Sequence, residues 1–171
     1  MKSRPDPVRV AISLGSNLGD RLAHLRSGVD RLERVLDDLR TSSVYETLPM
    51  DYRDQPRFLN ACCVGQTGLT ERQLLSELQD AERAAGRQRT AERYGPRTLD
   101  LDLLLYGDHV SHDQYLTLPH PRLHERVFVL VPLAELAPDW QVPLSGGAAA
   151  TVGELARQVD REGIVRMEAE L

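Results

Sequence analysis

The chain has 171 residues, of which 41% are hydrophobic and 27% charged, and this length and composition fit one globular domain. Its formal net charge of −5 at pH 7 argues against a general nucleic-acid coat. No apolar run approaches the roughly 20 residues of a membrane helix, and the N-terminus lacks the apolar core of a signal peptide. We therefore expect one cytoplasmic domain over residues 1–171, with flexible ends at 1–6 and 164–171 and no membrane or nucleic-acid partner.

Strand and helix patterns alternate in the first hundred residues. Extended segments are predicted at 8–14, 42–47 and 58–67. After the first of them, Asp20 is a good helix N-cap and apolar residues follow at helical spacing. After the third, Thr70 to Gln73 has the sequence of a capping box and Gly86 is a helix stop. With a further strand at 98–106 the order is βαββαβ, which predicts an α+β, ferredoxin-like sandwich with helices on one side of an antiparallel sheet.

Beyond this unit the sequence predicts a C-terminal hairpin and helices. A turn at Gly107-Asp108 precedes a short strand near 109–111. A helix is predicted from Val127 to Leu136, and Thr151 to Glu154 forms a second capping box before a last helix. From Gly163 onward we expect a short extended tail.

One strand carries a pair of acidic residues. Pro96 disfavours helix before it, and leucines then alternate with other residues up to Tyr106. Residues two apart in a strand face the same side, so Asp100 and Asp102 lie side by side, roughly 6 to 7 Å apart at Cα. A hard divalent cation would relieve the repulsion between two such carboxylates. The alternative is a strand with one ordinary solvent-exposed face. However, the apolar run after Asp102 predicts a central strand, where unpartnered aspartates would be energetically costly.

The segment before this strand is strongly basic. Its only acid is Glu92, and its arginines are Arg83, Arg87, Arg89, Arg93 and Arg97. Guanidinium groups match phosphate oxygens, and the segment ends three residues before the aspartate pair. A triphosphate and a metal could thus be held together, although a merely solvated loop is the alternative. With two glycines and few apolar residues, the segment should be mobile when empty.

The acidic strand also carries a family resemblance. Residues 95–106 read G-P-R-T-L-D-L-D-L-L-L-Y, which closely resembles the signature of the folate-pathway pyrophosphokinases that act on 6-hydroxymethyl-7,8-dihydropterin. Further matching motifs lie in order along the chain: SLGSNL at 13–18, SSVYET at 42–47, FLNA at 58–61, LPH at 118–120 and RVF at 126–128. The resemblance covers most of the chain up to about Pro138.

The resemblance implies a reaction and its participants. The diphosphate of ATP would pass to the hydroxymethyl group of 6-hydroxymethyl-7,8-dihydropterin, giving AMP and the pterin diphosphate in folate biosynthesis. Asp100 and Asp102 would hold two Mg²⁺ ions, one of which lowers the pKa of the attacking hydroxyl, while arginines neutralise charge on the phosphates. No side chain stands out as a general base. ATP and the pterin are the only expected partners, and we expect a monomer.

The resemblance also implies roles for individual residues. The catalytic set would be Arg87, Arg89, Arg97, Asp100 and Asp102, of which the two aspartates are the metal ligands. The pterin would be bound by Thr47, Leu48, Met50, Phe58, Asn60, Tyr94 and Phe128. ATP would be bound by Gln79, Glu82, Arg89, Arg93, Arg97, Leu103, Tyr115, Thr117, His120 and Arg126. Tyr94 and Tyr115 depart from the family, which often has tryptophan at the first position and a basic residue at the second.

Two other classes of protein remain open. A ferredoxin-like sheet with a basic loop could bind RNA, but RNA-binding sheets display aromatic side chains, whereas strand 58–67 offers Phe58, Asn60 and Cys62. A two-metal nucleotidyl transferase would also use paired aspartates, and it would release pyrophosphate rather than AMP. A zinc site at His120 and His124 is disfavoured, because prolines disrupt a shared helix and no further ligands cluster there.

Overall fold

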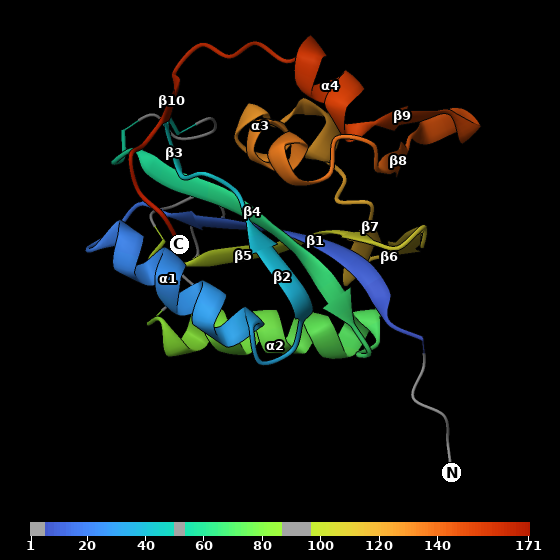
Figure 1. The fold of residues 1–171 in the computed structure, drawn as a ribbon, viewed down its shortest axis with the longest axis horizontal. Coiled ribbons are helices and arrows are strands. Elements are labelled where there is room, and N and C mark those ends of the chain that lie inside the picture. The colour runs from blue at the N-terminus through green and yellow to red at the C-terminus, as the bar shows by residue number, and fades with distance from the viewer. Residues whose placement is uncertain (1–5, 50–53, 87–96) are drawn as a thin grey trace.

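A six-stranded antiparallel sheet runs through the part of the chain that the computed structural model describes, residues 6–49, 54–86 and 97–171 (Figure 1). Its strand order is β10-β3-β4-β1-β5, and β2 pairs with β4 next to β3. The strands are β1 (Val8–Ser16), β2 (Asp37–Thr41), β3 (Tyr45–Thr47), β4 (Phe58–Thr67), β5 (Asp100–Tyr106) and β10 (Ile164–Arg166).

Helices cover both faces of this sheet. In Figure 1, α1 (Arg21–Leu32) and α2 (Glu71–Ala84) lie on one side, and α3 (Val127–Leu136) and α4 (Val152–Gln158) on the other. Two small hairpins, β6 (Ser111–Asp113) with β7 (Leu116–Leu118) and β8 (Gln141–Pro143) with β9 (Ala149–Thr151), lie outside the sheet, as do the 3-10 helices η1 (Leu123–Glu125) and η2 (Ser145–Gly147). None of the described helices is long and apolar enough to cross a membrane.

The predicted α+β, ferredoxin-like sandwich is confirmed.

The predicted helix starts are also confirmed. Asp20 accepts a hydrogen bond from the backbone N–H of Ala23 at the start of α1. Both capping boxes are formed, with Thr70 before α2 and Thr151 before α4. Beyond α2, Gly86 has a φ of +82°, a left-handed conformation that favours glycine. Strand 58–67 and helix 127–136 have the predicted bounds.

Two apolar cores lie on the two faces of the sheet. On β1, Ile12 and Leu14 face α1 and α2, whereas Ala11 faces α3 and α4. Leu101, the residue between the two aspartates, is 4% exposed and packs in the first core. The register of β5 shifts opposite Ala11 and Ile12, so that Leu105 instead packs in the second core.

The predicted central position of β5 is wrong. Among the described residues β5 is the last strand in the sheet order and pairs only with β1. Its apolar run reflects burial on both faces and the register shift, because Leu104 and Leu105 pack in one core and Leu103 in the other. A run of leucines indicates that both faces of a strand are buried. It does not indicate whether the strand is central or at the edge of the sheet, because that depends on its neighbouring strands.

Two further strand predictions need correction. The predicted strand 42–47 is interrupted, because only 45–47 forms β3 and the preceding β2 at 37–41 was missed. Ser42 spans the gap, since its N–H donates to the Cys62 carbonyl and its hydroxyl accepts from the Cys62 N–H. The predicted strand near 109–111 lies instead at 111–113 and pairs with β7, where Asp113 accepts a hydrogen bond from the Tyr115 N–H in the turn.

The C-terminal end differs from the predicted flexible tail. Ile164–Arg166 is extended as expected, but it forms β10 and pairs with β3. The Met167 N–H then donates to the Val44 carbonyl at 2.8 Å, and Met167 and Leu171 pack against the first core. Alternate apolar residues therefore anchor the end of the chain.

Candidate active site

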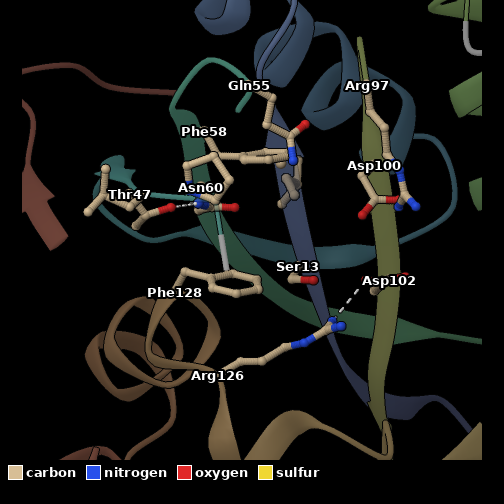
Figure 2. Close-up of a pocket in the computed structure, with 14 residues that line it drawn as sticks. Ser13, Thr47, Gln55, Phe58, Asn60, Arg97, Asp100, Asp102, Arg126 and Phe128 are labelled. Atoms are coloured by element: carbon tan, nitrogen blue, oxygen red, sulfur yellow. Dashed lines mark hydrogen bonds and ion pairs between the residues drawn. The ribbon is translucent and has the colours of Figure 1, made fainter. Parts of the chain in front are cut away.

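A pocket lies on the α3 side of the sheet, where β1 ends and β4 and β5 begin (Figure 2). The antiparallel register places Gly15 of β1 between Asn60 of β4 and Asp100 of β5. The same register places Ser13 opposite Asp102. Side chains from residues far apart in the sequence thus meet at one end of the sheet. The start of α3 closes the pocket with Phe128.

The two predicted aspartates line one side of the pocket. The Asp100 carboxylate forms an ion pair with Arg97 at 2.9 Å, and that of Asp102 lies 3.8 Å from the Arg126 guanidinium (Figure 2). The structure therefore places these four predicted residues together. Each carboxylate has an arginine beside it, which reduces the repulsion expected between two adjacent acids.

This donor set fits Mg²⁺. Magnesium prefers oxygen ligands and commonly takes only one or two carboxylates from the protein, with substrate phosphates and water completing its coordination. Asp100 and Asp102 supply two such carboxylates at the edge of an open pocket. Within the described residues no group of three or more His, Cys, Asp or Glu side chains could form a closed metal site.

His120 lies next to the acidic side as a neutral ring. Its pKa is lowered to about 4, mainly because it is buried and further because Arg126 and Arg122 are close, while Asp100 opposes the shift. The Nδ1 atom accepts a hydrogen bond from the Arg122 N–H, so the ring proton lies on Nε2, 4.0 Å from Asp102. This contact is therefore not an ion pair at neutral pH, and Nε2–H is available as a donor toward the acidic side.

Aromatic and amide groups form the opposite side of the pocket. Phe58 from the start of β4 and Phe128 from α3 both line it, and Figure 2 shows them on either side of Asn60. Asn60 is 5% exposed, and its side-chain amide donates a 2.6 Å hydrogen bond to the Thr47 hydroxyl. This bond fixes the orientation of the amide at the pocket wall. Leu48, one of the residues predicted to bind the pterin, also lines the pocket.

Several predicted nucleotide-site residues lie away from these pocket walls. The Leu103 side chain is buried in the first core, and the Glu82 carboxylate accepts a hydrogen bond from the Leu101 N–H. Tyr115 is 74% exposed in the β6–β7 turn, and the Thr117 hydroxyl donates to the Asp113 carbonyl. Gln79 lies on α2, on the other side of the sheet. The remaining predicted site residues, Met50, Arg87, Arg89, Arg93 and Tyr94, lie outside the described residues.

Sequence reasoning missed part of the pocket. Ser13, Gly15 and Gln55 line it, and none of them was assigned a role. Ser13 lies on the predicted strand 8–14, but Gly15 was expected to begin a turn, whereas β1 continues to Ser16 and places both residues on one face. That this face borders the aspartates depends on the pairing of β1 with β5, which no local pattern reveals.

An α+β fold that presents a carboxylate pair beside arginines, next to two phenylalanines and an amide, can bind a metal-bound phosphate donor beside a flat aromatic acceptor, which fits an enzyme that transfers phosphate groups. The sequence profile of one such family, described as 7,8-dihydro-6-hydroxymethylpterin-pyrophosphokinase (HPPK), matches residues 11–138. The chain belongs to this family. Its members transfer pyrophosphate from ATP to hydroxymethyldihydropterin in folate synthesis.

Individual relatives agree with this assignment. The 2-amino-4-hydroxy-6-hydroxymethyldihydropteridine pyrophosphokinase of Bacillus subtilis is 45% identical over 127 residues, 73% of this chain and 75% of that protein. The folic acid synthesis protein fol1 of Pneumocystis carinii is 41% identical over 150 residues, 87% of this chain but 20% of that longer protein. A crystal structure of HPPK-DHPS from Plasmodium falciparum matches with a TM-score of 0.70 and 14% identity, over 92% of this chain and 44% of that one, and it supports the fold.

Proposed function

We propose that this chain transfers the terminal diphosphate of ATP to the hydroxymethyl oxygen of 6-hydroxymethyl-7,8-dihydropterin, giving AMP and the pterin diphosphate. One observation carries the proposal. A single pocket joins an acidic side, with Asp100, Asp102 and two arginines, to an aromatic side with Phe58 and Phe128. The phosphate donor and the flat acceptor can thus be bound next to each other, which is the main requirement of a direct transfer.

On the acidic side, Asp100 and Asp102 would hold two Mg²⁺ ions. Bound Mg²⁺ would supply charge neutralisation on the phosphates and lower the pKa of the acceptor hydroxyl. Arg97 and Arg126 lie beside these carboxylates and would donate to phosphate oxygens, and the neutral His120 ring would offer Nε2–H as a further donor. No described side chain is assigned as a general base.

On the aromatic side, Phe58 and Phe128 would stack on the pterin. Stacking on a flat heteroaromatic ring supplies area and orientation, and the Asn60 amide can pair with the polar edge of the ring. The hydrogen bond from Asn60 to Thr47 supports this role because it fixes the amide before the ligand arrives. We extend the pterin site to Leu48, Met50 and Tyr94 on the resemblance.

The ATP contacts that we propose outside the acidic side of the pocket rest on the family resemblance alone. We assign ATP contacts to Gln79, Glu82, Arg89, Arg93, Leu103, Tyr115 and Thr117, and catalytic contacts to Arg87 and Arg89. Because the Leu103 side chain lies in the core, its backbone is the part that a nucleotide would meet.

We further propose that residues 1–171 act as one domain, as a monomer and in the cytoplasm. Both cysteines are buried and free, which supports a reducing compartment such as the cytoplasm. Light scattering coupled to size exclusion, with and without both substrates, tests the monomer.

The reaction is tested by incubating the protein with ATP, Mg²⁺ and the dihydropterin and identifying the nucleotide product. AMP supports the proposal. Pyrophosphate would favour a nucleotidyl transferase, and no turnover together with RNA binding would favour an RNA-binding module. Asp102→Asn should abolish AMP formation, whereas Asp30→Asn, on the exposed side of α1, is the matched control.

A further inference from the structure

Asn17 links the two sides of the pocket. It follows the end of β1 at Ser16 and is 2% exposed. Its backbone N–H donates to the Arg97 carbonyl at 3.0 Å, and its side-chain Oδ1 accepts from the Arg97 N–H at 2.7 Å. Its Nδ2 donates to Gln55 Oε1 at 3.0 Å and to the Pro56 carbonyl at 3.1 Å. One buried residue thus bridges two chain segments that lie about forty residues apart in sequence.

The two bonded segments lead to opposite sides of the pocket. Arg97 ends the basic segment, and its side chain pairs with Asp100 on the acidic side. Pro56 lies two residues before Phe58, the first residue of β4 and part of the aromatic side. Asn17 holds the backbones of both segments. Its amide therefore sets the distance between Arg97, the arginine proposed to bind phosphate, and Phe58, the first residue on the aromatic side.

We propose that Asn17 is a positioning residue that holds the acceptor hydroxyl and the transferring phosphorus at reactive spacing. The inference rests on the proposed function. In the part of the chain that the structure describes, Asn17 is not among the residues that line the pocket, and its side chain bonds to Gln55, Pro56 and Arg97, whereas the Asn60 amide bonds to Thr47. Each ligand can therefore still bind without it, but their relative placement relaxes. A misplacement of about 1 Å in such an arrangement can lower a rate by about 100-fold.

The test is single-turnover kinetics of Asn17→Ala beside equilibrium titrations of each ligand. We expect the rate constant of the chemical step at saturation to fall by about 100-fold, while the Kd of ATP alone and of the pterin alone changes by less than about threefold. The matched control is Thr67→Val. Thr67 is 1% exposed, and its hydroxyl donates to the Val35 carbonyl and accepts from the Leu69 N–H at the far end of β4. This control should lose thermal stability and keep its rate.

A second variant protects the test against misfolding. Asn17→Asp keeps an acceptor for the Arg97 N–H but cannot donate to the Pro56 carbonyl, so the rate should again fall with little change in either Kd. A normal rate in a folded Asn17 variant, or a loss of rate matched by equal losses of both affinities, would overturn the inference. Absence of AMP from the wild-type protein would instead contradict the proposed function.

Discussion

Gly15 lies directly against Asn60 and Phe58, two residues of the proposed pterin site. A Cβ at this position would lie 3.1 Å from Asn60 Oδ1 and 3.7 Å from a Phe58 ring carbon. Only a residue without a side chain lets both groups rest on β1 in this way. The glycine is thus needed for close approach, and its φ is not in the left-handed region.

Gly15→Ala should therefore weaken pterin binding. The methyl group displaces the Asn60 amide by a few tenths of an ångström and strains its bond to Thr47, so we expect the pterin Kd to rise about tenfold or more, with the ATP Kd nearly unchanged. Titration of each ligand measures this. Gly68→Ala is the control, because nothing lies within 4 Å of its added Cβ. Equal effects on ATP and pterin would show that the glycine supports the sheet rather than the pterin wall.

His120 should make the ligand-free protein sensitive to acid. Its folded-state pKa of about 4 lies below the usual 6.5, so between these values the unfolded chain binds a proton that the folded protein does not. Stability is therefore unaffected above the usual pKa and falls as the pH drops through this window, by up to about 1 kcal/mol per pH unit. Among the described residues, the charged groups around the ring are Asp100, Asp102, Arg122 and Arg126.

The measurement is urea unfolding of the wild type and of His120→Gln between pH 7 and pH 4.5, without Mg²⁺ or ATP. The wild type should lose more stability than the variant over this range, because the variant has no imidazole to protonate. Parallel curves for the two proteins would mean that His120 titrates normally in the folded state.

For single residues, the sequence predicts which side chains can bind a metal or an aromatic ring better than it predicts which side chains lie next to each other. Asp100, Asp102 and the two phenylalanines could be named because their types and spacings, or a family motif, point to metal and ring binding. Gly15 and Asn17 could not be assigned, because their roles come from contacts with Asn60, Gln55 and Arg97. Those contacts exist only after β1 has paired with β4 and β5.

At the scale of elements, local signals were reliable and pairing was not. The Asp20 N-cap, two capping boxes and helical spacing predicted the four α-helices of the described residues, since the residues that set helix ends are neighbours in sequence. The edge position of β5, the break between β2 and β3, and the docking of β10 were not predicted. Each of these features depends on which strand lies alongside. The sequence of β2 does not have the pattern of a strand, because it includes charged residues such as Asp37 and Arg40 and is largely exposed.

The pairing of β10 with β3 has a consequence for the proposed pterin site. Ile164 pairs with Thr47, whose hydroxyl holds Asn60, and the Met167 N–H donates to the Val44 carbonyl just before β3. Met167→Pro removes this donor, so we expect β3 to loosen, the pterin Kd to rise by about tenfold, and stability to fall by about 1 to 3 kcal/mol.

Met167→Ala is the matched control, because it removes the side chain but keeps the N–H. Comparing the two variants by pterin titration and urea unfolding separates the strand pairing from the packing of the methionine. If both variants bound the pterin equally well, β10 would have no part in shaping the site.

At the scale of the whole molecule, the two cores have different relations to the pocket. The first core, under α1 and α2, supports the sheet from the face opposite the pocket. The second core, under α3 and α4, lies on the same face as the pocket and holds α3, which carries Phe128. Both cores share β1 and β4, so the sheet should couple them into one cooperative unit.

Leu25→Ala and Leu133→Ala test this division. Both leucines are fully buried, one on α1 in the first core and the other on α3 in the second, so each truncation should lower the free energy of unfolding by about 2 to 5 kcal/mol. Each variant should still unfold in one transition, with the same midpoint by fluorescence and by circular dichroism. Only Leu133→Ala should also weaken pterin binding, because the cavity it leaves lets α3 and Phe128 shift. Similar pterin affinity in both variants would show that α3 is held by its other contacts, and two separate transitions would show that the cores are independent.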